Sequence, residues 1–291
     1  MDFINGQELL DLCTEHQCSI SNIMLQREII IGEKPIEKIN KKLETALNIM
    51  KDSAHAPLTN PQKSIGGLLG GEAKSLYEFS LNTTPLCGTV LSKAIAYSMA
   101  VLEVNATMGL IVAAPTAGSS GVVPGCILAA TEEFNFSNEI LKNGLLNTSA
   151  IGYILMRNAS VSGAEAGCQA EVGSASAMAA SALVEMLGGT PEMSLQAASL
   201  ALSNLLGLVC DPIAGLVESP CQSRNAIGVS NAFTCAQLAL SGITHPVPFD
   251  EMVEAMYRVG RSLPFELRET AMGGNASTPT GCALGCSSCS K

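Results

Sequence analysis

Three cysteines, Cys168, Cys210 and Cys221, lie in polar segments near predicted helix boundaries, where a cysteine that only fills the core is uncommon. Thiolates at helix N-terminal ends, or near Arg224, are expected to have lowered pKa values and to bind metal readily. Three thiolates are one ligand short of a closed tetrahedral site, whereas an iron–sulfur cube held by three cysteines leaves one Lewis-acidic iron open. The unequal gaps between the cysteines match no standard cluster motif, so spacing alone leaves shared metal binding open.

A second segment suited to chemistry is a run of six small residues that precedes a predicted helix. Its glycines let backbone N–H groups approach a ligand, its hydroxyls add donors, and a helix N-terminus favours an anion. A small carboxylate would fit such a loop, although the same pattern also suits an N-capped helix after a turn. The candidate substrate-binding residues are Thr116, Ala117, Gly118, Ser119, Ser120 and Gly121.

The catalytic base is harder to assign from the sequence. A lone histidine is more often structural than catalytic, and only His55 is a candidate, because it falls in a segment rich in Gly, Pro, Ser and Thr. This segment, 52–89, is expected to be a loop. Its Gly-rich run 64–71 lacks the Gly-Lys-Ser/Thr ending of a P-loop, which argues against nucleotide binding. Arg224 is expected to pair with charge at the cysteine site or on the substrate, or to form a salt bridge with Glu218 or another acid.

The composition is acidic and strongly apolar. The formal net charge of -10 argues against nucleic acid and against an anionic membrane surface, since both attract basic residues. Hydrophobic residues make up 47% of the chain and the mean hydropathy is +0.31, yet prolines, glycines or polar residues interrupt the two longest uncharged stretches. No membrane span is therefore predicted. The polar, acidic N-terminus does not resemble a signal peptide, so a cytoplasmic location is expected.

The elements that must position these residues are predicted to be helices. Ala, Ser and Gly dominate from about residue 90 to 240 and favour closely packed helices, while strand signals are sparse. Apolar periodicity predicts a helical N-terminal arm over 8–51 and helices over 90–110, 121–133, 145–160, 173–187, 193–208, 224–241 and 250–261. We therefore expect an all-α fold, with one compact catalytic domain over 1–270 and a buried central helix at 193–208. A flexible, cysteine-rich tail is expected over 271–291.

Five segments of the chain resemble the alpha subunit of iron–sulfur L-serine dehydratases. Two are specific: Gly-Cys-Gln-Ala-Glu-Val-Gly, which contains Cys168, and Cys-Asp-Pro-Ile-Ala-Gly-Leu-Val-Glu-x-Pro-Cys, which runs from Cys210 to Cys221. The others are the Thr-Ala-Gly-Ser-Ser-Gly region, the segment that starts at Ile20 and the segment that starts at Leu267. The resemblance extends over about residues 8 to 280.

The resemblance implies an L-serine ammonia-lyase of amino-acid degradation and gluconeogenesis, which converts L-serine to pyruvate and ammonia. It implies that Cys168, Cys210 and Cys221 hold a 4Fe-4S cluster whose open iron acts as a Lewis acid. Pyridoxal phosphate is not expected, because no lysine of the predicted core stands in a convincing context. In some family members a C-terminal cysteine caps the open iron; of the three tail cysteines (Cys282, Cys286 and Cys289), Cys289 is the first candidate.

The family's smaller beta portion has no counterpart in the chain, so a separate beta subunit and an oligomeric assembly are expected. Two alternatives stay open. One is an L-cysteine desulfidase on the same architecture, which a sulfide assay would separate from a serine dehydratase. The other is a non-enzymatic iron–sulfur or zinc-binding protein, which would turn over no amino acid even with its partner chain.

Overall fold

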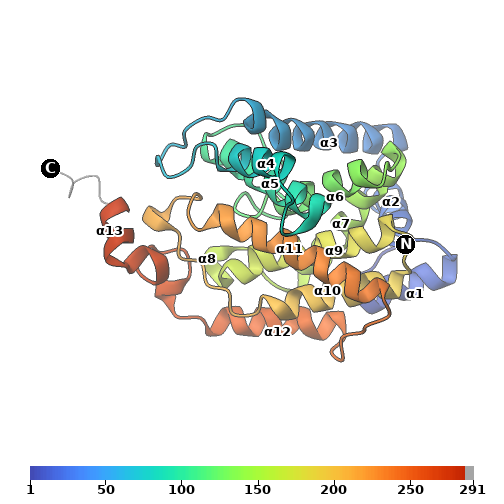
Figure 1. The fold of residues 1–291 in the computed structure, drawn as a ribbon. Helices are drawn as coiled ribbons and strands as arrows, with labels where there is room; N and C mark the ends of the chain where they lie inside the picture. The colour runs from blue at the N-terminus through green and yellow to red at the C-terminus, as the bar shows by residue number, and fades with distance from the viewer. Residues whose placement is uncertain (286–291) are drawn as a thin grey trace.

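The computed structural model describes residues 1–285, and over these residues the protein is built from helices (Figure 1). Within that range no strand forms, and the only β-type pairing is an isolated bridge between Cys210 and Arg268. The all-α prediction is confirmed. The α-helices are α1 (Gly6–His16), α2 (Ile20–Ile30), α3 (Ile36–Thr59), α4 (Glu72–Asn82), α5 (Gly88–Ala106), α6 (Val122–Glu133), α7 (Asn138–Asn158), α8 (Gly163–Ala166), α9 (Ser174–Met186), α10 (Pro191–Asn204), α11 (Cys221–Leu240), α12 (Phe249–Ser262) and α13 (Pro279–Gly285). A π-helical turn, η1 (Gln169–Gly173), and three 3-10 turns, η2 (Ile213–Gly215), η3 (Phe265–Leu267) and η4 (Gly274–Ser277), complete the described elements.

Helix α9 is the central helix of the fold. Every one of its residues except Glu185 is buried, and it packs against α6, α7, α10 and α11 (Figure 1). The sequence places this central helix at 193–208, but α10 buries only one face, while residues such as Glu192 and Asn204 reach the surface. The reason is that α9 consists mainly of Ala and Ser, whose small side chains let neighbours approach from every side.

Small residues also bring α5 and α6 close together. A Cβ atom at Gly121 would lie 2.1 Å from the backbone oxygen of Ser98, and one at Gly125 would lie 2.7 Å from that of Ala94. No side chain other than hydrogen fits at these positions. The contact fixes the start of α6 and with it the end of the Thr116–Gly121 loop.

The N-terminal region is more deeply embedded than the expected arm. Phe3, Leu9, Ile20 and Ile23 are fully buried and belong to the main hydrophobic core. Helix α3 extends to Thr59, so the predicted loop over 52–89 is wrong for its first part, and α4 forms within its second part. Burial explains the difference, since apolar residues near the end of α3 face the core and outweigh the local composition.

The segment after α12 packs against the cysteine-rich region. The backbone and side-chain N–H groups of Asn275 donate to the buried Asp211 carboxylate at 2.7 and 2.9 Å. Cys282 lies on α13, so the flexible tail expected from residue 271 contains regular turns as far as residue 285. Cys286 and the candidate ligand Cys289 lie outside the described residues. None of the helices in residues 1–285 combines the length and hydropathy that crossing a bilayer requires.

Candidate metal centre

The three candidate cysteines come from three different elements. Cys168 precedes the π-helical turn η1, Cys221 is the first residue of α11, and Cys210 lies on the segment between α10 and η2. Cys210 is held in place by the C-terminal segment, because its N–H donates to the Leu267 oxygen and its oxygen accepts from the Glu269 N–H. All three side chains are buried, with exposed fractions of 2%, 2% and 6%.

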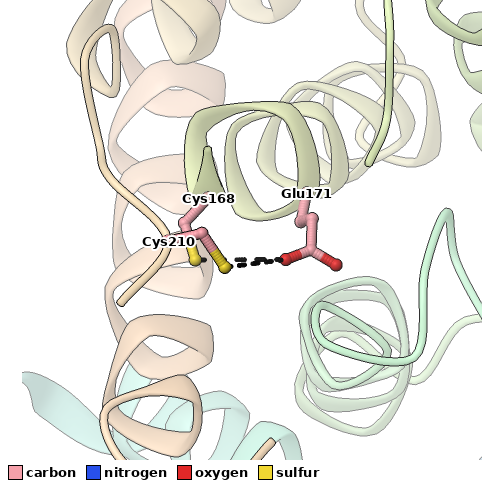
Figure 2. Close-up of side chains that lie close together, drawn as sticks. All are labelled: Cys168, Glu171 and Cys210. Atoms are coloured by element: carbon pink, nitrogen blue, oxygen red, sulfur yellow. Dashed lines mark hydrogen bonds between the residues drawn. The ribbon is translucent and has the colours of Figure 1, made fainter. Parts of the chain in front are cut away.

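Two of these thiols converge on a carboxylate. The Sγ atoms of Cys168 and Cys210 and a carboxylate oxygen of Glu171 all lie within 4.8 Å of one another, and their side chains point toward a common centre (Figure 2). The two Sγ atoms are 4.0 and 3.9 Å from Glu171 Oε2. Two thiols and one carboxylate form a donor set that can hold a metal ion. We call Cys168, Glu171, Cys210 and Cys221 the thiol site.

Glu171 is a candidate site residue that the sequence reasoning does not single out. It stands in the same motif as Cys168, three residues further on, a spacing that places two side chains on one face of a helix. That spacing was the available signal. Burial raises the pKa of Glu171, and the hydrogen bond from Thr116 opposes this effect. A hydrogen bond with Cys210 also opposes the effect of burial, whereas the charge of Glu269 adds to it.

The thiol site has a shortage of positive charge. A hydrogen bond with Cys168, burial and the charges of Cys168 and Glu171 raise the pKa of Cys210 well above its usual range. Burial and the same two charges also raise the pKa of Cys221, and Arg224 lowers it only in part. The expectation of lowered pKa values is wrong for these two thiols without a bound cation. A metal would reverse the balance, because a coordinating thiol loses its proton.

Arg224 links the thiol site to a buried acid. Its Nη1 lies 2.7 Å from Asp211 Oδ1, donates to the Val209 oxygen at 2.8 Å and lies 3.5 Å from Cys168 Sγ. The acid that forms a salt bridge with Arg224 is therefore Asp211 and not Glu218. A guanidinium in this position offsets part of the negative charge that ionised thiols would carry.

Glu218 binds the Gly-rich loop before α4. Its buried carboxylate accepts hydrogen bonds from Ser64 Oγ at 2.7 Å, Gly66 N at 2.6 Å and Leu68 N at 3.0 Å. The loop thus surrounds an anion that belongs to the protein itself. This contact fixes the loop against the segment that leads into Cys221.

The Thr116–Gly121 loop lies beside the thiol site. Thr116 Oγ1 donates to Glu171 Oε1 at 2.7 Å. Asn225, one turn after Cys221 on α11, donates to the Gly118 oxygen at 2.7 Å and accepts from Gly121 N at 3.1 Å. The predicted binding loop and the predicted metal ligands are therefore brought together by Glu171 and α11.

The six loop residues have different surroundings. Ser119 and Ser120 are fully buried, and their hydroxyls contact Thr116 Oγ1 and the Ala117 oxygen inside the loop. No side chain caps the start of α6, so the N-cap interpretation does not apply. The backbone N–H groups of Ala117, Gly118 and Ser119 make no hydrogen bond with any residue in 1–285. Consecutive unpaired N–H groups are suited to binding an anion.

Two glycines leave space around Glu171. A Cβ atom at Gly163 would lie 2.6 Å from Glu171 Oε2 and 2.9 Å from Cys210 Sγ, and one at Gly118 would lie 2.9 Å from Glu171 Oε1. Any larger side chain at either position would crowd the donor atoms. The glycines therefore keep room beside the donor atoms of the thiol site.

His55 belongs to a different group of side chains. Its Nε2 lies 3.4 Å from Glu132 Oε1, and Glu132 Oε2 accepts from Tyr97 at 2.8 Å and lies 3.2 Å from Lys93 Nζ. We call these four residues the histidine cluster. None of its described contacts joins it to the thiol site, so the structure adds no support for His55 as a catalytic residue.

In the all-helical part of the chain that the structure describes, buried thiols and a carboxylate that could hold a metal ion lie beside a loop with unpaired N–H groups. The family model for serine dehydratase alpha chains matches residues 15–276. The L-serine dehydratase alpha chain of Peptoniphilus asaccharolyticus is 50% identical over 95% of this chain and 94% of its own length. A probable L-serine dehydratase alpha chain of Bacillus subtilis is 47% identical over 96% of this chain and 93% of its own length. The chain belongs to the serine dehydratase alpha chain family.

Longer relatives carry additional sequence. The L-serine dehydratase of Helicobacter pylori is 36% identical over 95% of this chain, which covers 62% of that relative. An L-serine dehydratase of Escherichia coli is 34% identical, and the chain again covers 62% of it. Each of these relatives therefore matches most of this chain and carries further sequence beyond the matched part.

Proposed function

We propose that this chain is the catalytic alpha subunit of an iron–sulfur L-serine dehydratase, which converts L-serine to pyruvate and ammonia together with a separate beta chain. The observation that carries the proposal is the link from Cys168 and Cys210 through Glu171 to Thr116, which joins a metal-binding donor set to an anion-binding loop. Family membership supplies the reaction, and the names of the relatives, which are called alpha chains, support a second subunit.

The residues that would hold a 4Fe-4S cluster are Cys168, Cys210 and Cys221. Cys221 lies outside the 4.8 Å group, yet the charges of Cys168 and Glu171 influence its pKa, so it belongs to the same electrostatic environment. A single tetrahedral ion needs ligand atoms within about 4 Å of one another, so a third, more distant thiol favours a larger, multinuclear group. When bound through three cysteines, such a cluster supplies a Lewis-acidic iron.

The chain's own residues would bind and orient the substrate. The N–H groups of Ala117, Gly118 and Ser119 would donate hydrogen bonds to the serine carboxylate. The Thr116 hydroxyl would either turn from Glu171 toward the ligand or keep its hydrogen bond to Glu171 and hold the loop in position. Asn225 holds the loop in place from α11. No residue of this chain is identified as the general base, so the beta chain would be the source of this residue.

Anaerobic reconstitution with iron and sulfide tests the proposal. Wild type is compared with Cys168→Ala, Cys210→Ala and Cys221→Ala by iron content and visible absorbance. Cys235→Ala is the matched control, because Cys235 is also buried on α11 but contacts Asn204 and Asn231 instead. We expect four irons in wild type and in the control, and fewer in each of the three variants.

Turnover is then measured with the reconstituted alpha chain and its beta chain. Pyruvate from L-serine supports the proposed activity, while sulfide from L-cysteine as the preferred reaction would indicate a desulfidase. Normal iron binding in all three variants would contradict the cluster assignment. Iron binding without turnover of either amino acid would contradict the enzymatic function.

A further inference from the structure

The segment between α5 and the Thr116–Gly121 loop is an unusual feature of this helical protein. Residues 109–114 read Gly-Leu-Ile-Val-Ala-Ala and belong to no helix, strand or turn. Among residues 1–285, no hydrogen bond involves the backbone N–H or C=O of any residue from Leu110 to Ala114. An apolar segment with a complete row of unpaired backbone groups therefore runs along the protein.

This segment is anchored on one side and open on the other. Ile111 and Val112 pack against the hydrophobic core, while Leu110 is 71% exposed and the preceding Met108 is 79% exposed. Five residues span about 16 Å when extended, which is the length of an ordinary β-strand, and this segment ends in a bend at Ala114. A strand whose backbone groups are unpaired is a template on which another chain can add a strand.

An apolar groove lies beside the segment. Val112, Ala113, Ala114 and Pro115 line a hollow of about 430 Å³ between α3 and α7, whose wall also includes the 62% exposed Met156. Val112 also lines a second hollow of about 490 Å³. The side chains of Lys38, Lys41 and Lys42 lie at this second hollow, so the rim is positively charged although the whole chain carries a net charge of -10.

We propose that the separate beta chain adds an extended, apolar segment with acidic flanks to residues 110–114, pairing with their backbone and placing side chains in the adjoining groove. This inference rests on the proposed function, which supplies the partner. The backbone pattern specifies a strand, the groove specifies apolar side chains, and the three lysines specify acidic neighbours.

A second copy of this chain fits the surface less well. Two copies that paired their 110–114 segments about a two-fold axis would bring two sets of the same three lysines together, and like charges oppose such contact. The lysine rim therefore favours a different, acidic partner.

The position of the segment gives the contact a consequence for catalysis. Ala114 is followed directly by Pro115 and then Thr116, so a partner that fixes residues 110–114 also fixes the start of the candidate substrate loop. The alpha chain alone would keep this segment unpaired. We expect low turnover from the alpha chain alone for this reason, even with its cluster in place.

Hydrogen exchange on the reconstituted alpha chain, with and without its beta chain, tests the proposal directly. The amides of Leu110 to Ala114 should exchange rapidly in the alpha chain alone, and those on the paired edge of the segment (either Leu110, Val112 and Ala114, or Ile111 and Ala113) should exchange at least about tenfold more slowly in the complex. A complex that forms by light scattering while these amides stay unprotected would overturn the proposal, as would failure of the beta chain to bind. Protection of the same amides in the alpha chain alone, with dimer formation, would assign the segment to a second copy and overturn it too.

Two proline variants separate strand pairing from a general apolar contact. Leu110→Pro and Ala113→Pro each remove one N–H group, and because the residues are three apart in an extended chain these groups point to opposite edges. We expect one variant to weaken beta-chain binding by about 5- to 10-fold and the other to change it by less than about twofold. Equal effects, or none, would contradict strand addition. Iron content and circular dichroism verify that each variant folds.

The charge of the rim is tested by the triple variant Lys38→Glu/Lys41→Glu/Lys42→Glu, with Lys63→Glu as an exposed control on the Gly-rich loop. The triple variant should weaken beta-chain binding by about 10-fold or more at low salt, and the control should not. Unchanged binding in the triple variant would contradict an acidic partner at this groove. Serine turnover by the saturated wild-type complex is measured separately, so that a failed activity assay and a failed interface are distinguished.

Discussion

The thiol site and the histidine cluster are both groups of ionisable side chains, but they treat charge in opposite ways. In the histidine cluster, Glu132 faces His55, Tyr97 and Lys93, so the acid finds its partners within the protein. In the thiol site, two thiols and a carboxylate face one another within 4.8 Å. Contact with Cys168, burial and nearby negative charges raise the pKa values of Cys210 and Cys221.

This difference in charge balance indicates which of the two regions needs a bound cation. A half-exposed cluster that balances its own charge gains nothing essential from a cation, and its contribution to stability is small. A buried group of like-charged donors is stable in its ionised form only when a cation joins it. The arrangement of charge thus selects the thiol site, and not the histidine cluster, as the place for a cofactor.

Of the changes considered, removal of the cofactor should have the largest effect, and this effect should arise at the thiol site and not at the histidine cluster. We expect a chelator with oxidation to lower serine turnover by roughly 100-fold or more, because the reaction loses its Lewis acid, and anaerobic iron and sulfide to restore it. Iron analysis and pyruvate formation by the complex with its beta chain provide the measurements, and added zinc is the control that should not restore turnover. Full activity in iron-free enzyme would remove the proposed distinction between the two regions.

Two arginines, one at the thiol site and one on the surface, allow the effect of burial on stability to be compared. Arg224 is 14% exposed and pairs with the 3% exposed Asp211, whereas Arg258 is 72% exposed and pairs with Glu254 on the surface of α12. We expect Arg224→Met to lower the free energy of unfolding by about 3 kcal/mol, because it leaves a buried carboxylate without its cation. Arg258→Met should change it by less than about 1 kcal/mol.

Urea denaturation of iron-free protein measures this difference without interference from the cofactor. Iron retention by the reconstituted Arg224 variant gives a second readout, since the guanidinium lies 3.5 Å from Cys168 Sγ. Similar losses of stability in the two arginine variants would show that burial of the Arg224–Asp211 pair has no special effect.

Much of the fold can be predicted from local sequence. Apolar periodicity places α5, α6, α9, α10, α11 and α12 within a few residues of their observed positions. It does not identify which helix is central, because that depends on how many neighbours surround it. The composition of residues 52–89 predicts a loop at His55, whereas buried Ala54, Pro57 and Leu58 hold this part of α3 against the core.

The candidate site is predicted in part. The motifs identify Cys168, Cys210 and Cys221, and the structure brings the first two together and joins them to the Thr116 loop. The partner of Arg224 depends on a contact between separate segments, which no local pattern encodes. The sequence predicts lowered thiol pKa values from helix ends and Arg224. Arg224 does lower the pKa of Cys221, but burial and like charges, which only the fold reveals, raise the pKa values of Cys210 and Cys221 more.

The pH dependence of the histidine cluster can be derived from its contacts. The hydrogen bond to Glu132 raises the pKa of His55 above its ordinary 6.5, so the pair stabilises the fold fully below pH 6.5 and loses this contribution as pH rises through the raised value. Burial opposes ionisation of Glu132, but hydrogen bonds from His55, Tyr97 and Lys93 lower its pKa to about 2. The contribution of ionised Glu132 to stability is present above pH 4.5 and is lost as pH falls toward 2.

His55→Gln should therefore have the smallest effect of the changes considered. The His55 and Glu132 side chains are 46% and 39% exposed, and Glu132 keeps Tyr97 and Lys93 as partners, so solvent screening limits the loss to less than about 1 kcal/mol. The difference in unfolding free energy between variant and wild type should be largest near pH 5 to 6 and disappear at high pH, where His55 is neutral. Denaturation curves across this range, with the exposed His16→Gln as control, measure it. A large, pH-independent loss of serine turnover in His55→Gln, with normal stability, would instead assign His55 to catalysis and remove the contrast between the two regions.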